Sequence, residues 1–565
     1  MEIGRVVGVY GRNIVKISVP DALLPQVARP GVYVKMYGAD RSTVLYGMVV
    51  GFNMLDELYR RARIIEELEG YEEFRPARNE MTVHISGYLS GEKVSKGVPI
   101  LPKPGERVYL VSKEELQKIF NRGDVAIGVL STCPEVEIKI DVNGMCTRHT
   151  AILAMTGAGK SNTVAVIIAS LLKYFRRPRI IIIDTHSEYI PLARISDNVR
   201  VLAPKGKVAD LIKAQYQVDP IPLEVPLWLL GVEEIYNILG LDPRATKQRL
   251  YLRQALKALR VERFKGEGYD LTADDPVHFT LEELRTAVID VSGSSSSRIR
   301  DRSAEDLCLK IEDLSEEREL YFMTRPEYLE QRFSEYIKDG DEVTASFQVY
   351  GDFARSLLDP GLNIMGLGGL SSEVQASIVS ALLRALWRIA VEQRFRGERI
   401  ATLVVLEEAH IYAPMTWSPS KQIVEKIAKE GRKFGVSLLV VSQRPRELSQ
   451  TLLAQCGNLV ALRTVNPSDQ EHILRSMEDV TRDTVESLPG LQTGEALVSG
   501  PMLPLPALVK IFSFREVYNE ELGGKDVNYR EVWSSEELKE LSIPTPPRHA
   551  IKVEDTKQKS LLDFN

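Results

Sequence analysis

The segment AMTGAGKSNT, at residues 154–163, has the residue types and spacing of a phosphate-binding loop. It follows the apolar run TAILAM, which predicts a strand, and it precedes TVAVIIASLL, which predicts a helix. At such a junction the backbone N–H groups and the positive end of the helix face the phosphate oxygens of a nucleotide. The alternative is a glycine turn that binds nothing, and the strand, loop and helix context argues against it.

The residues of this loop have separate tasks in binding ATP and Mg2+. Gly157 and Gly159 let the backbone wrap closely around the phosphates. Lys160 would reach the β and γ phosphates, and the Ser161 hydroxyl would hold Mg2+. Ala154 stands where the full pattern begins with Gly, which weakens the match but leaves its context intact. The predicted cofactor-binding residues are Thr156, Gly157, Ala158, Gly159, Lys160, Ser161 and Asn162.

Two adjacent carboxylates end a second apolar run, LVVLEEAH. A buried strand that ends in Glu407 and Glu408 delivers both to the edge of a sheet where α/β proteins place their ligands. We assign Glu407 to the Mg2+ shell and Glu408 to orienting or polarising the attacking water. The alternative is a pair of solvated surface glutamates, which a buried strand end disfavours.

The run VSLLVVSQRP predicts a third strand, which ends beside these acids at Gln443. A neutral amide there could sense the γ phosphate. Arg444 could serve the same region or cap the turn. Upstream, KEGRKFG places Arg432 between a helix and this strand, where it suits a finger that reaches a neighbouring subunit's active site. Arg432 as an ordinary surface charge is the alternative.

The elements around these motifs predict several domains. Short β-rich runs up to residue 112 suggest a small barrel, with an acidic helix-like insertion at 55–74. Strands then alternate with helices, as in a doubly wound α/β sheet, and a charged helical block with a serine-rich loop interrupts them. We expect a β-barrel at 1–130, the first part of an ATPase core at 131–205, an inserted helical subdomain at 206–340, the second part of the core at 341–514, and a C-terminal arm and tail at 515–565.

The composition narrows the class of protein. The 565 residues are 44% hydrophobic and 27% charged, which is typical of a soluble globular protein. We find no apolar run long enough to span a bilayer and no signal peptide, so we expect a cytoplasmic protein without a membrane partner. The four cysteines form no C-x-x-C pair. The net charge of −6 disfavours a protein that coats nucleic acid, but not a ring with basic groups in its pore.

With these motifs, the chain resembles the HerA family, archaeal hexameric DNA translocases and helicases of the HerA–FtsK P-loop ATPase superfamily. The resemblance rests on TGAGKSNT, IIIDTHSEY, LEEAH, EGRKFGVSLLVVSQRP and TGEALVSG, in that order. It implies a RecA-like core with a helical insertion, an N-terminal barrel of the HAS type, and a homo-hexamer. It also implies double-stranded DNA as the substrate and a NurA-type nuclease as the partner, in DNA-end resection and break repair.

The resemblance assigns roles to single positions. Glu407 and Glu408 are its acidic pair, Gln443 its sensor and Arg432 its finger supplied in trans. The first of the two acids is Glu here, whereas most P-loop enzymes use Asp. Arg148, before the P-loop strand, matches a basic position near the phosphates. Asp184 and Glu188 match supporting positions close to the active site.

Two further segments suggest partners. On a helix, Arg249, Arg253, Lys257 and Arg260 would share one face, which is either a solvated basic face or a stripe that lines a DNA pore. At the end of the chain, Gln558, Leu561 and Phe564 have the spacing of peptides that bind sliding clamps. Rival functions remain: a ring ATPase of the same core that moves protein, or a nucleotide-gated scaffold with little turnover.

Overall fold

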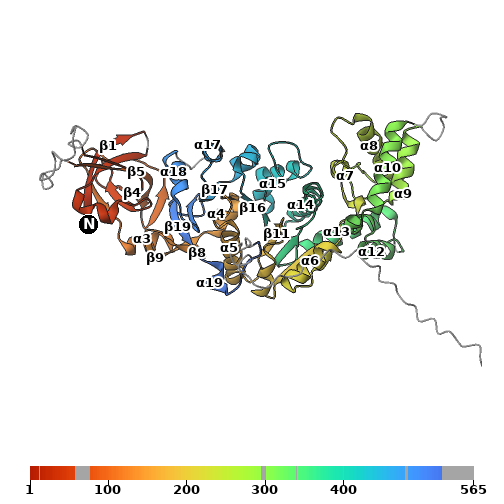
Figure 1. Ribbon diagram of the computed structural model, residues 1–565, viewed down its shortest axis with the longest axis horizontal. Coiled ribbons are helices and arrows are strands. Elements are labelled where there is room, and N and C mark those ends of the chain that lie inside the picture. Colours follow the sequence, from red (N-terminus) through yellow and green to blue (C-terminus); the bar gives the residue numbers. More distant parts are fainter. Residues whose placement is uncertain are drawn as a thin grey trace, which may run out of the picture. The chain divides into compact units, whose positions relative to one another are not determined.

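The N-terminal strands form a closed barrel (Figure 1). The computed structural model describes residues 1–11, 13–56, 77–293, 301–338, 340–398, 400–476 and 482–524. Within these residues, the ring of six strands runs in the order β2-β1-β7-β3-β4-β5, and a β2–β5 pairing closes it. The barrel strands are β1 (Glu2–Tyr10), β2 (Ile14–Ser18), β3 (Tyr33–Tyr37), β4 (Val44–Asp56), β5 (Ala77–Ser90) and β7 (Arg107–Leu110), and β6 (Lys93–Lys96) pairs with β5 outside the ring.

Alternation of side chains along these strands explains why they curl into a barrel. Val15 and Ile17 of β2 are fully buried, as are Val34 and Met36 of β3. Residues two apart along a strand point to the same face, so each strand lines the barrel interior with every second side chain. The predicted N-terminal barrel is confirmed. The predicted insertion at 55–74 lies largely outside the described residues.

The rest of the chain up to Gly523 is built around a large sheet, which has twelve strands in the described residues. Its order is β13-β12-β14-β11-β15-β16-β10-β17-β18-β19-β8-β9. The strands from β13 to β17 pair in parallel and the remaining strands pair antiparallel. Their bounds are β8 (Val125–Leu130), β9 (Cys133–Ile140), β10 (Thr150–Leu153), β11 (Arg179–Asp184), β12 (Val199–Pro204), β13 (Ile221–Leu223), β14 (Gly361–Gly366), β15 (Thr402–Leu406), β16 (Val436–Ser442), β17 (Asn458–Leu462), β18 (Glu495–Ser499) and β19 (Ala507–Ile511).

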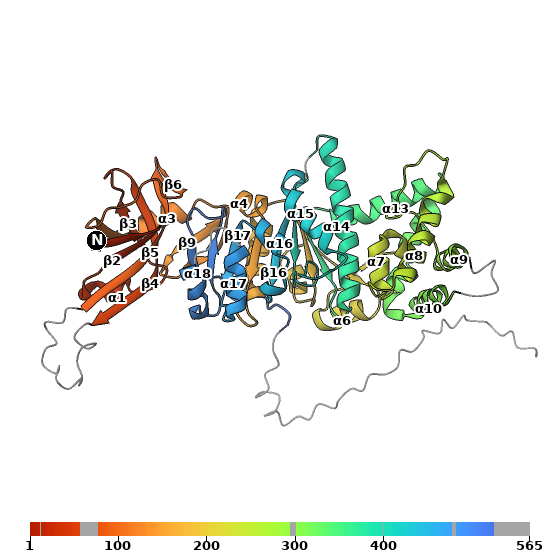
Figure 2. The same cartoon turned by 90° about the horizontal axis from the view of Figure 1, so that it is seen from above.

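Helices cover both faces of this sheet, as in a doubly wound fold (Figures 1 and 2). From β10 the chain passes through α5 (Lys160–Tyr174) to β11, which lies three strands away from β10 toward the β13 edge of the sheet. From β15 it passes through α15 (Lys421–Phe434) to β16, in the opposite direction. Because crossovers between parallel strands are right-handed, these two helices lie on opposite faces. All residues of β10, β14, β15, β16 and β17 are buried, which confirms the α/β prediction.

Two strands lie where the sequence analysis did not expect them. β8 falls within the range assigned to the barrel, but it pairs with β19 of the large sheet, far along the chain. β13 falls within the block predicted to be helical, and it extends the parallel edge beyond β12. β8 is set by pairing with a distant segment, which local sequence patterns do not report, whereas β13 has only three residues, too few to form such a pattern.

The inserted block otherwise consists of helices, and α7 to α10 gather into one cluster in both views (Figures 1 and 2). The helices of this block and its flanks are α6 (Lys207–Tyr216), α7 (Val232–Ile238), α8 (Thr246–Arg260), α9 (Leu281–Val291), α10 (Arg302–Glu316), α11 (Tyr321–Thr324), α12 (Tyr328–Tyr336) and α13 (Glu342–Leu357). Residues 294–300, in the serine-rich loop, lie outside the described residues.

The basic face predicted on α8 is not formed as a whole. The guanidinium of Arg260 is fully buried and donates hydrogen bonds to the carbonyls of Trp228, Leu230 and Ala273. Arg249 pairs with Glu233 at 2.8 Å. Of the four predicted basic side chains, Arg253 and Lys257 are exposed and Arg249 is partly exposed. The last turn of the helix, which carries Arg260, is packed against the rest of the inserted block instead.

One helix corrects the membrane analysis. α14 (Ser372–Phe395) is long and apolar enough to cross a membrane, although we found no such run in the sequence. In this fold it is a core helix, and 78% of its most apolar window is buried within the protein. Its apolar composition is therefore explained by packing on the sheet and against α7, α13 and α15.

Candidate nucleotide site at the carboxyl edge of the sheet

Strand register brings the predicted motifs to one edge of the sheet. Leu153 of β10 pairs with Ser442 of β16, so the P-loop and Gln443 leave neighbouring strands at the same level. Leu406 of β15 pairs with Ile183 of β11, so Glu407 lies beside Asp184. Since the connections from β10 and β15 leave to opposite faces, this edge is the crevice where doubly wound sheets bind ligands.

The P-loop has the backbone that its glycines allow. Gly157 and Gly159 have φ values of +77° and +102°, which side-chain-bearing residues rarely adopt. At Gly159 a Cβ atom would also lie 3.4 Å from the backbone nitrogen of Gly494. α5 begins directly after it, at Lys160. Ala154 has no positive φ, so the absence of the first glycine costs this loop no conformational strain.

Lys160 and the acidic pair form a buried charged cluster. Glu407 and Glu408 are 1% and 3% exposed, and Lys160 is 7% exposed. The Lys160 ammonium lies 3.3 Å from Glu407 Oε1 and donates a hydrogen bond to Glu408 Oε1. Glu408 has a φ of +47°, and strained backbone of this kind occurs at functional sites. The structure thus brings together the three residues on which the predicted chemistry depends.

Gln443 joins this cluster to the P-loop. Its side-chain nitrogen donates to Glu408 Oε1 at 2.5 Å, and its oxygen accepts from Thr156 Oγ1 at 2.5 Å. His410 Nδ1 lies 3.2 Å from the other oxygen of Glu408. The sequence analysis assigned no role to His410. His410 is part of the motif LEEAH, but only the turn after β15 brings its ring beside the Glu408 carboxylate.

The two acids differ in how their surroundings affect their protonation. Burial raises the pKa of Glu407 above its usual value, although the Lys160 charge opposes the shift. Burial also acts to raise the pKa of Glu408, but the hydrogen bonds from His410, Lys160 and Gln443 and the charge of Lys160 lower it to about 2. Glu408 is therefore ionised at any working pH, while Glu407 is the easier of the two to protonate.

The turn after β11 places a third carboxylate on the P-loop helix. The buried Asp184 carboxylate accepts backbone N–H bonds from Glu188 at 2.9 Å and Tyr189 at 2.8 Å. This fixes Glu188, whose Oε2 accepts a 2.9 Å hydrogen bond from Ser161 Oγ. Burial, followed by the charge of Glu407, raises the pKa of Asp184 well above its ordinary value. Asp184 thus shapes the turn, and Glu188 contacts the hydroxyl predicted to hold Mg2+.

The oxygen atoms at this edge fit a magnesium ion shared with phosphates. Among the described residues, no group of three His, Cys, Asp or Glu side chains forms a ready-made metal site. Within the same residues, the buried Oε2 atom of Glu407 accepts no hydrogen bond. A buried carboxylate oxygen without a partner is costly unless a cation uses it. Mg2+ commonly binds one or two carboxylates together with substrate phosphates and water, so Ser161 and Glu407 have the right chemistry.

The side chain of Asn162 has partners that the sequence did not predict. Its side-chain nitrogen donates to the carbonyl of Phe512 at 2.8 Å, and its side-chain oxygen accepts from the Phe514 N–H at 2.8 Å. These bonds anchor the segment that leads into α19 (Phe514–Tyr518) beside the P-loop helix. The Asn162 side chain is therefore engaged with the C-terminal segment, and only its backbone amide is available to a phosphate.

The structure does not bring Arg148 and Arg432 to the P-loop of their own chain. Both are exposed. Arg148 lies between α4 (Val142–Thr147) and the first residue of β10, and Arg432 lies near the end of α15, just before β16. Because the P-loop follows β10, these arginines lie at the opposite, amino edge of the same sheet. The expectation that Arg148 lies near the phosphates is therefore wrong within one chain.

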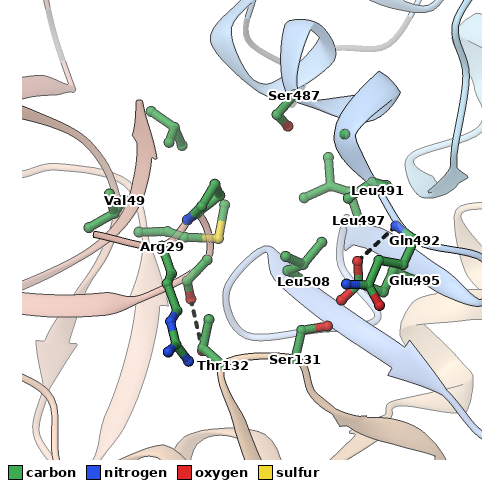
Figure 3. Close-up of a pocket in the computed structure, with 15 residues that line it drawn as sticks. Arg29, Val49, Ser131, Thr132, Ser487, Leu491, Gln492, Glu495, Leu497 and Leu508 are labelled. Atoms are coloured by element: carbon green, nitrogen blue, oxygen red, sulfur yellow. Dashed lines mark hydrogen bonds between the residues drawn. The ribbon is translucent and has the colours of Figure 1, made fainter. Parts of the chain in front are cut away.

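The amino edge is hollowed beside Arg432. A pocket of about 420 Å3 is lined by Arg394, Glu398, Ile400, Ala401, Arg432, Lys433, Phe434 and Gly435. A second cavity, of about 300 Å3, lies between barrel residues such as Arg29 and Val49 and large-sheet residues such as Leu508 (Figure 3). It contains none of the predicted site residues, so it is separate from the nucleotide site.

A parallel sheet whose P-loop faces a buried acidic pair at its carboxyl edge defines a P-loop NTPase. Two family models match the chain, "Helicase HerA, central domain" over residues 125–386 and "Helicase HerA-like C-terminal" over residues 397–505. The DNA double-strand break repair helicase HerA of Pyrococcus furiosus is 31% identical over 510 residues, which cover 83% of this chain and 85% of that one. The protein of the same name from Sulfolobus acidocaldarius is 28% identical over 550 residues, covering 96% and 98%. The chain belongs to the HerA family.

Among solved structures, VirB4 of Thermoanaerobacter pseudethanolicus is similar, with a TM-score of 0.49 and 18% identity over 71% of this chain and 99% of that one. The plasmid coupling protein TrwB in complex with ADP and Mg2+ has a TM-score of 0.45 and 14% identity, over 71% and 93%.

Proposed function

We propose that this protein hydrolyses ATP with Mg2+ and uses the energy to move double-stranded DNA. The observation that supports it most strongly is the buried contact of Lys160 with Glu407 and Glu408, beside Gln443. A lysine charge held in this way is at the place where phosphates bind a P-loop, and it can exchange its carboxylate partners for phosphate oxygens. Family membership and the names of the relatives support DNA as the substrate.

Glu408 is proposed to orient the attacking water. When Lys160 turns to the phosphates, the Glu408 carboxylate loses one hydrogen-bond donor and can accept one from water instead. The hydrogen bonds from His410 and Gln443 still lower the pKa of Glu408 in that arrangement, so its contribution is to hold and polarise the water rather than to keep its proton. Gln443 contacts both Glu408 and Thr156 of the P-loop, so its amide can report whether a γ phosphate is present.

Ser161 and Glu407 would hold Mg2+, which when bound supplies positive charge to the phosphate oxygens. In the structure described here Ser161 donates to Glu188. We infer that Glu188 keeps the hydroxyl oriented toward the site and then supports the water shell of the ion. Asp184 fixes the turn that carries Glu188 and takes no direct part.

Arg148 and Arg432 are proposed to act on the nucleotide of a neighbouring subunit. β10 has four residues, so about 13 Å of strand separates the amino edge of the sheet from the P-loop of the same chain. An arginine on that exposed edge can reach a phosphate only if another subunit presents one. If the two arginines act on a nucleotide, that nucleotide belongs to another subunit, and we propose the homo-hexameric ring expected from the family resemblance.

We further propose a cytoplasmic role in DNA-end resection and break repair, with a NurA-type nuclease as partner. The curated relatives are named as DNA double-strand break repair helicases, which supports the repair role for this chain. The sliding-clamp contact through Gln558, Leu561 and Phe564 stays a hypothesis, because these residues lie outside the described part of the chain.

ATP turnover with and without linear double-stranded DNA tests the proposal and separates its rivals. We expect DNA to stimulate the wild type and Lys173→Ala, an exposed position on α5, whereas Lys160→Ala should be inactive under both conditions. Turnover without stimulation by any DNA would favour a motor that moves protein. ATP binding without turnover would favour a nucleotide-gated scaffold.

A further inference from the structure

Arg148 and Arg432 come from segments far apart in the sequence, yet one buried residue is linked to both. That residue is His149, which is 2% exposed and follows Arg148 directly, while its ring contacts the helix and the strand on either side of Arg432. It precedes β10, whose neighbour in the sheet is β16, and Arg432 lies just before β16. His149 plays no part in the nucleotide pocket at the carboxyl edge, so its burial and contacts need another explanation.

The imidazole of His149 joins a helix to a strand. Its Nδ1 accepts a 3.0 Å hydrogen bond from the backbone N–H of Leu438, and its Nε2 donates to the carbonyl of Ala428 at 3.0 Å. An amide can only donate and a carbonyl can only accept, so these partners fix one neutral tautomer of the ring. Ala428 is four residues before Arg432 on α15, so its carbonyl is the helical acceptor for the Arg432 N–H. His149 thus binds the helical turn that ends at Arg432.

The backbone of Arg148 and His149 is also held in one conformation. The Arg148 carbonyl accepts from the Gly457 N–H at 2.6 Å. The His149 carbonyl accepts from the Asn458 side chain at 2.9 Å and from its N–H at 3.3 Å. His149 has a φ of +49°, a left-handed conformation that is costly for a histidine and persists only where the surroundings impose it.

We propose that His149 is a positioning residue that sets Arg148 and Arg432 as one rigid pair, ready to act together on the nucleotide bound by an adjacent subunit. The inference rests on the proposed function, and adds to it the residue that aligns the two arginines. An exposed arginine that is an ordinary surface charge does not need a fixed position, because its interaction with solvent is the same wherever the side chain lies. An arginine that must meet a phosphate needs its helix and its strand fixed, because a misplacement of about 1 Å can lower a rate by about a hundredfold.

His149→Asn should remove one hydrogen bond of the imidazole, to Ala428, and keep the other, from Leu438. Asparagine tolerates positive φ, and its oxygen can still accept from the Leu438 N–H, but its side chain is too short to reach the Ala428 carbonyl. We expect the kcat for ATP to fall by about ten- to a hundredfold, with the KM for ATP changed by less than about threefold. His149→Gln, which is long enough to reach Ala428, should retain more activity than His149→Asn. Lys429→Ala, an exposed change on the same helix, is the matched control and should leave kcat unchanged.

Mixed oligomers give a readout that a purely structural role would not alter. Lys160→Ala subunits have no working P-loop but keep intact arginines, so next to a His149→Asn subunit they supply what it lacks. We expect turnover per His149→Asn subunit to rise as Lys160→Ala protein is added. The rise is measured against the same mixture of wild type and Lys160→Ala, which corrects for inactive neighbours. Constant or falling turnover per His149→Asn subunit would overturn the proposal.

Two further comparisons separate this inference from the proposed function beneath it. Mixing Arg432→Ala with Lys160→Ala tests the finger in trans alone, and a failure to complement there would remove the basis for any role of His149. In a chain that carries Arg148→Ala and Arg432→Ala, adding His149→Asn should lower kcat by less than about twofold, because the residues it aligns are gone. If His149→Asn lowers kcat in that background as much as it does in the wild type, while Arg432→Ala is still complemented by Lys160→Ala, then His149 acts only on folding.

Discussion

Replacing Lys160 by alanine should destabilise the nucleotide-free protein as well as remove a phosphate ligand. The Lys160 ammonium lies 3.3 Å from Glu407 Oε1, and both side chains are almost fully buried. At an effective dielectric constant of about 20, two unit charges at this separation attract each other by about 5 kcal/mol. Removing one partner of a buried pair costs about 3 to 5 kcal/mol, because it leaves charge buried without compensation. Differential scanning calorimetry without nucleotide should therefore show the unfolding transition of Lys160→Ala about 3 to 5 °C lower, because the entropy of unfolding of a 565-residue chain is about 1.1 kcal/mol per kelvin.

Two features of this effect distinguish it from an unspecific loss of stability. Glu407 already has a raised pKa, and without Lys160 that pKa rises further, so Glu407 takes up a proton as the pH falls. The stability difference from the wild type should therefore be largest at pH 8 and shrink on acidification. Adding Glu408→Gln to Lys160→Ala should restore stability, although Glu408→Gln alone lowers it. Lys173→Ala on the exposed side of α5 is the control. Equal transition temperatures for Lys160→Ala and wild type at pH 8 would refute the reasoning.

Further predictions concern the acid, the buried histidine and the insertion. Glu408→Gln should lower kcat by about a hundredfold or more in steady-state assays while ATP binding persists, and unchanged turnover would remove Glu408 from the mechanism. Burial lowers the pKa of His149 from 6.5 to about 4, so below pH 6.5 the unfolded chain binds a proton that the folded protein does not bind. Between pH 6.5 and 4 the protein should therefore lose about 3 kcal/mol of stability in denaturant titrations. This loss should be absent in His149→Asn. Arg260→Leu should destabilise the insertion by about 3 kcal/mol, because three carbonyls lose their donor, whereas Arg253→Ala should change stability by less than about 0.5 kcal/mol.

The fold and the core of the site could be predicted because they depend on local patterns. Apolar runs with little alternation predicted buried parallel strands, and Gly157, Gly159 and Lys160 identified the loop between a strand and a helix. The carboxyl ends of parallel strands meet at one edge, so Glu407 and Gln443 were expected to lie together before their contacts were known. The contacts of Lys160 with both acids agree with that reasoning.

What could not be predicted depends on which distant segments meet. Arg260 continues the basic pattern of α8, but the end of the helix is buried against the carbonyls of Trp228 and Leu230. His149 and His410 are single histidines without a spacing pattern, and only pairing between strands shows what they contact. Helical periodicity reports that a face exists, but not which part of it another segment covers.

The same limit applies to Arg148. Its position two residues before β10 places it at the amino edge, whereas the resemblance suggested that it lies near the phosphates. Both statements hold together only when the phosphates belong to a second subunit. The sequence of one chain carries no information about which edges of two copies meet.

Equilibrium binding of ATP with Mg2+ in the slow-turnover background of Glu408→Gln tests the central claim most directly. We predict that Glu408→Gln binds ATP and that adding Lys160→Ala, which this background stabilises, weakens the binding at least about tenfold, because a charge-assisted contact to phosphate is lost. Equal affinity of the folded single and double variants would show that the nucleotide does not lie between the P-loop and the acidic pair.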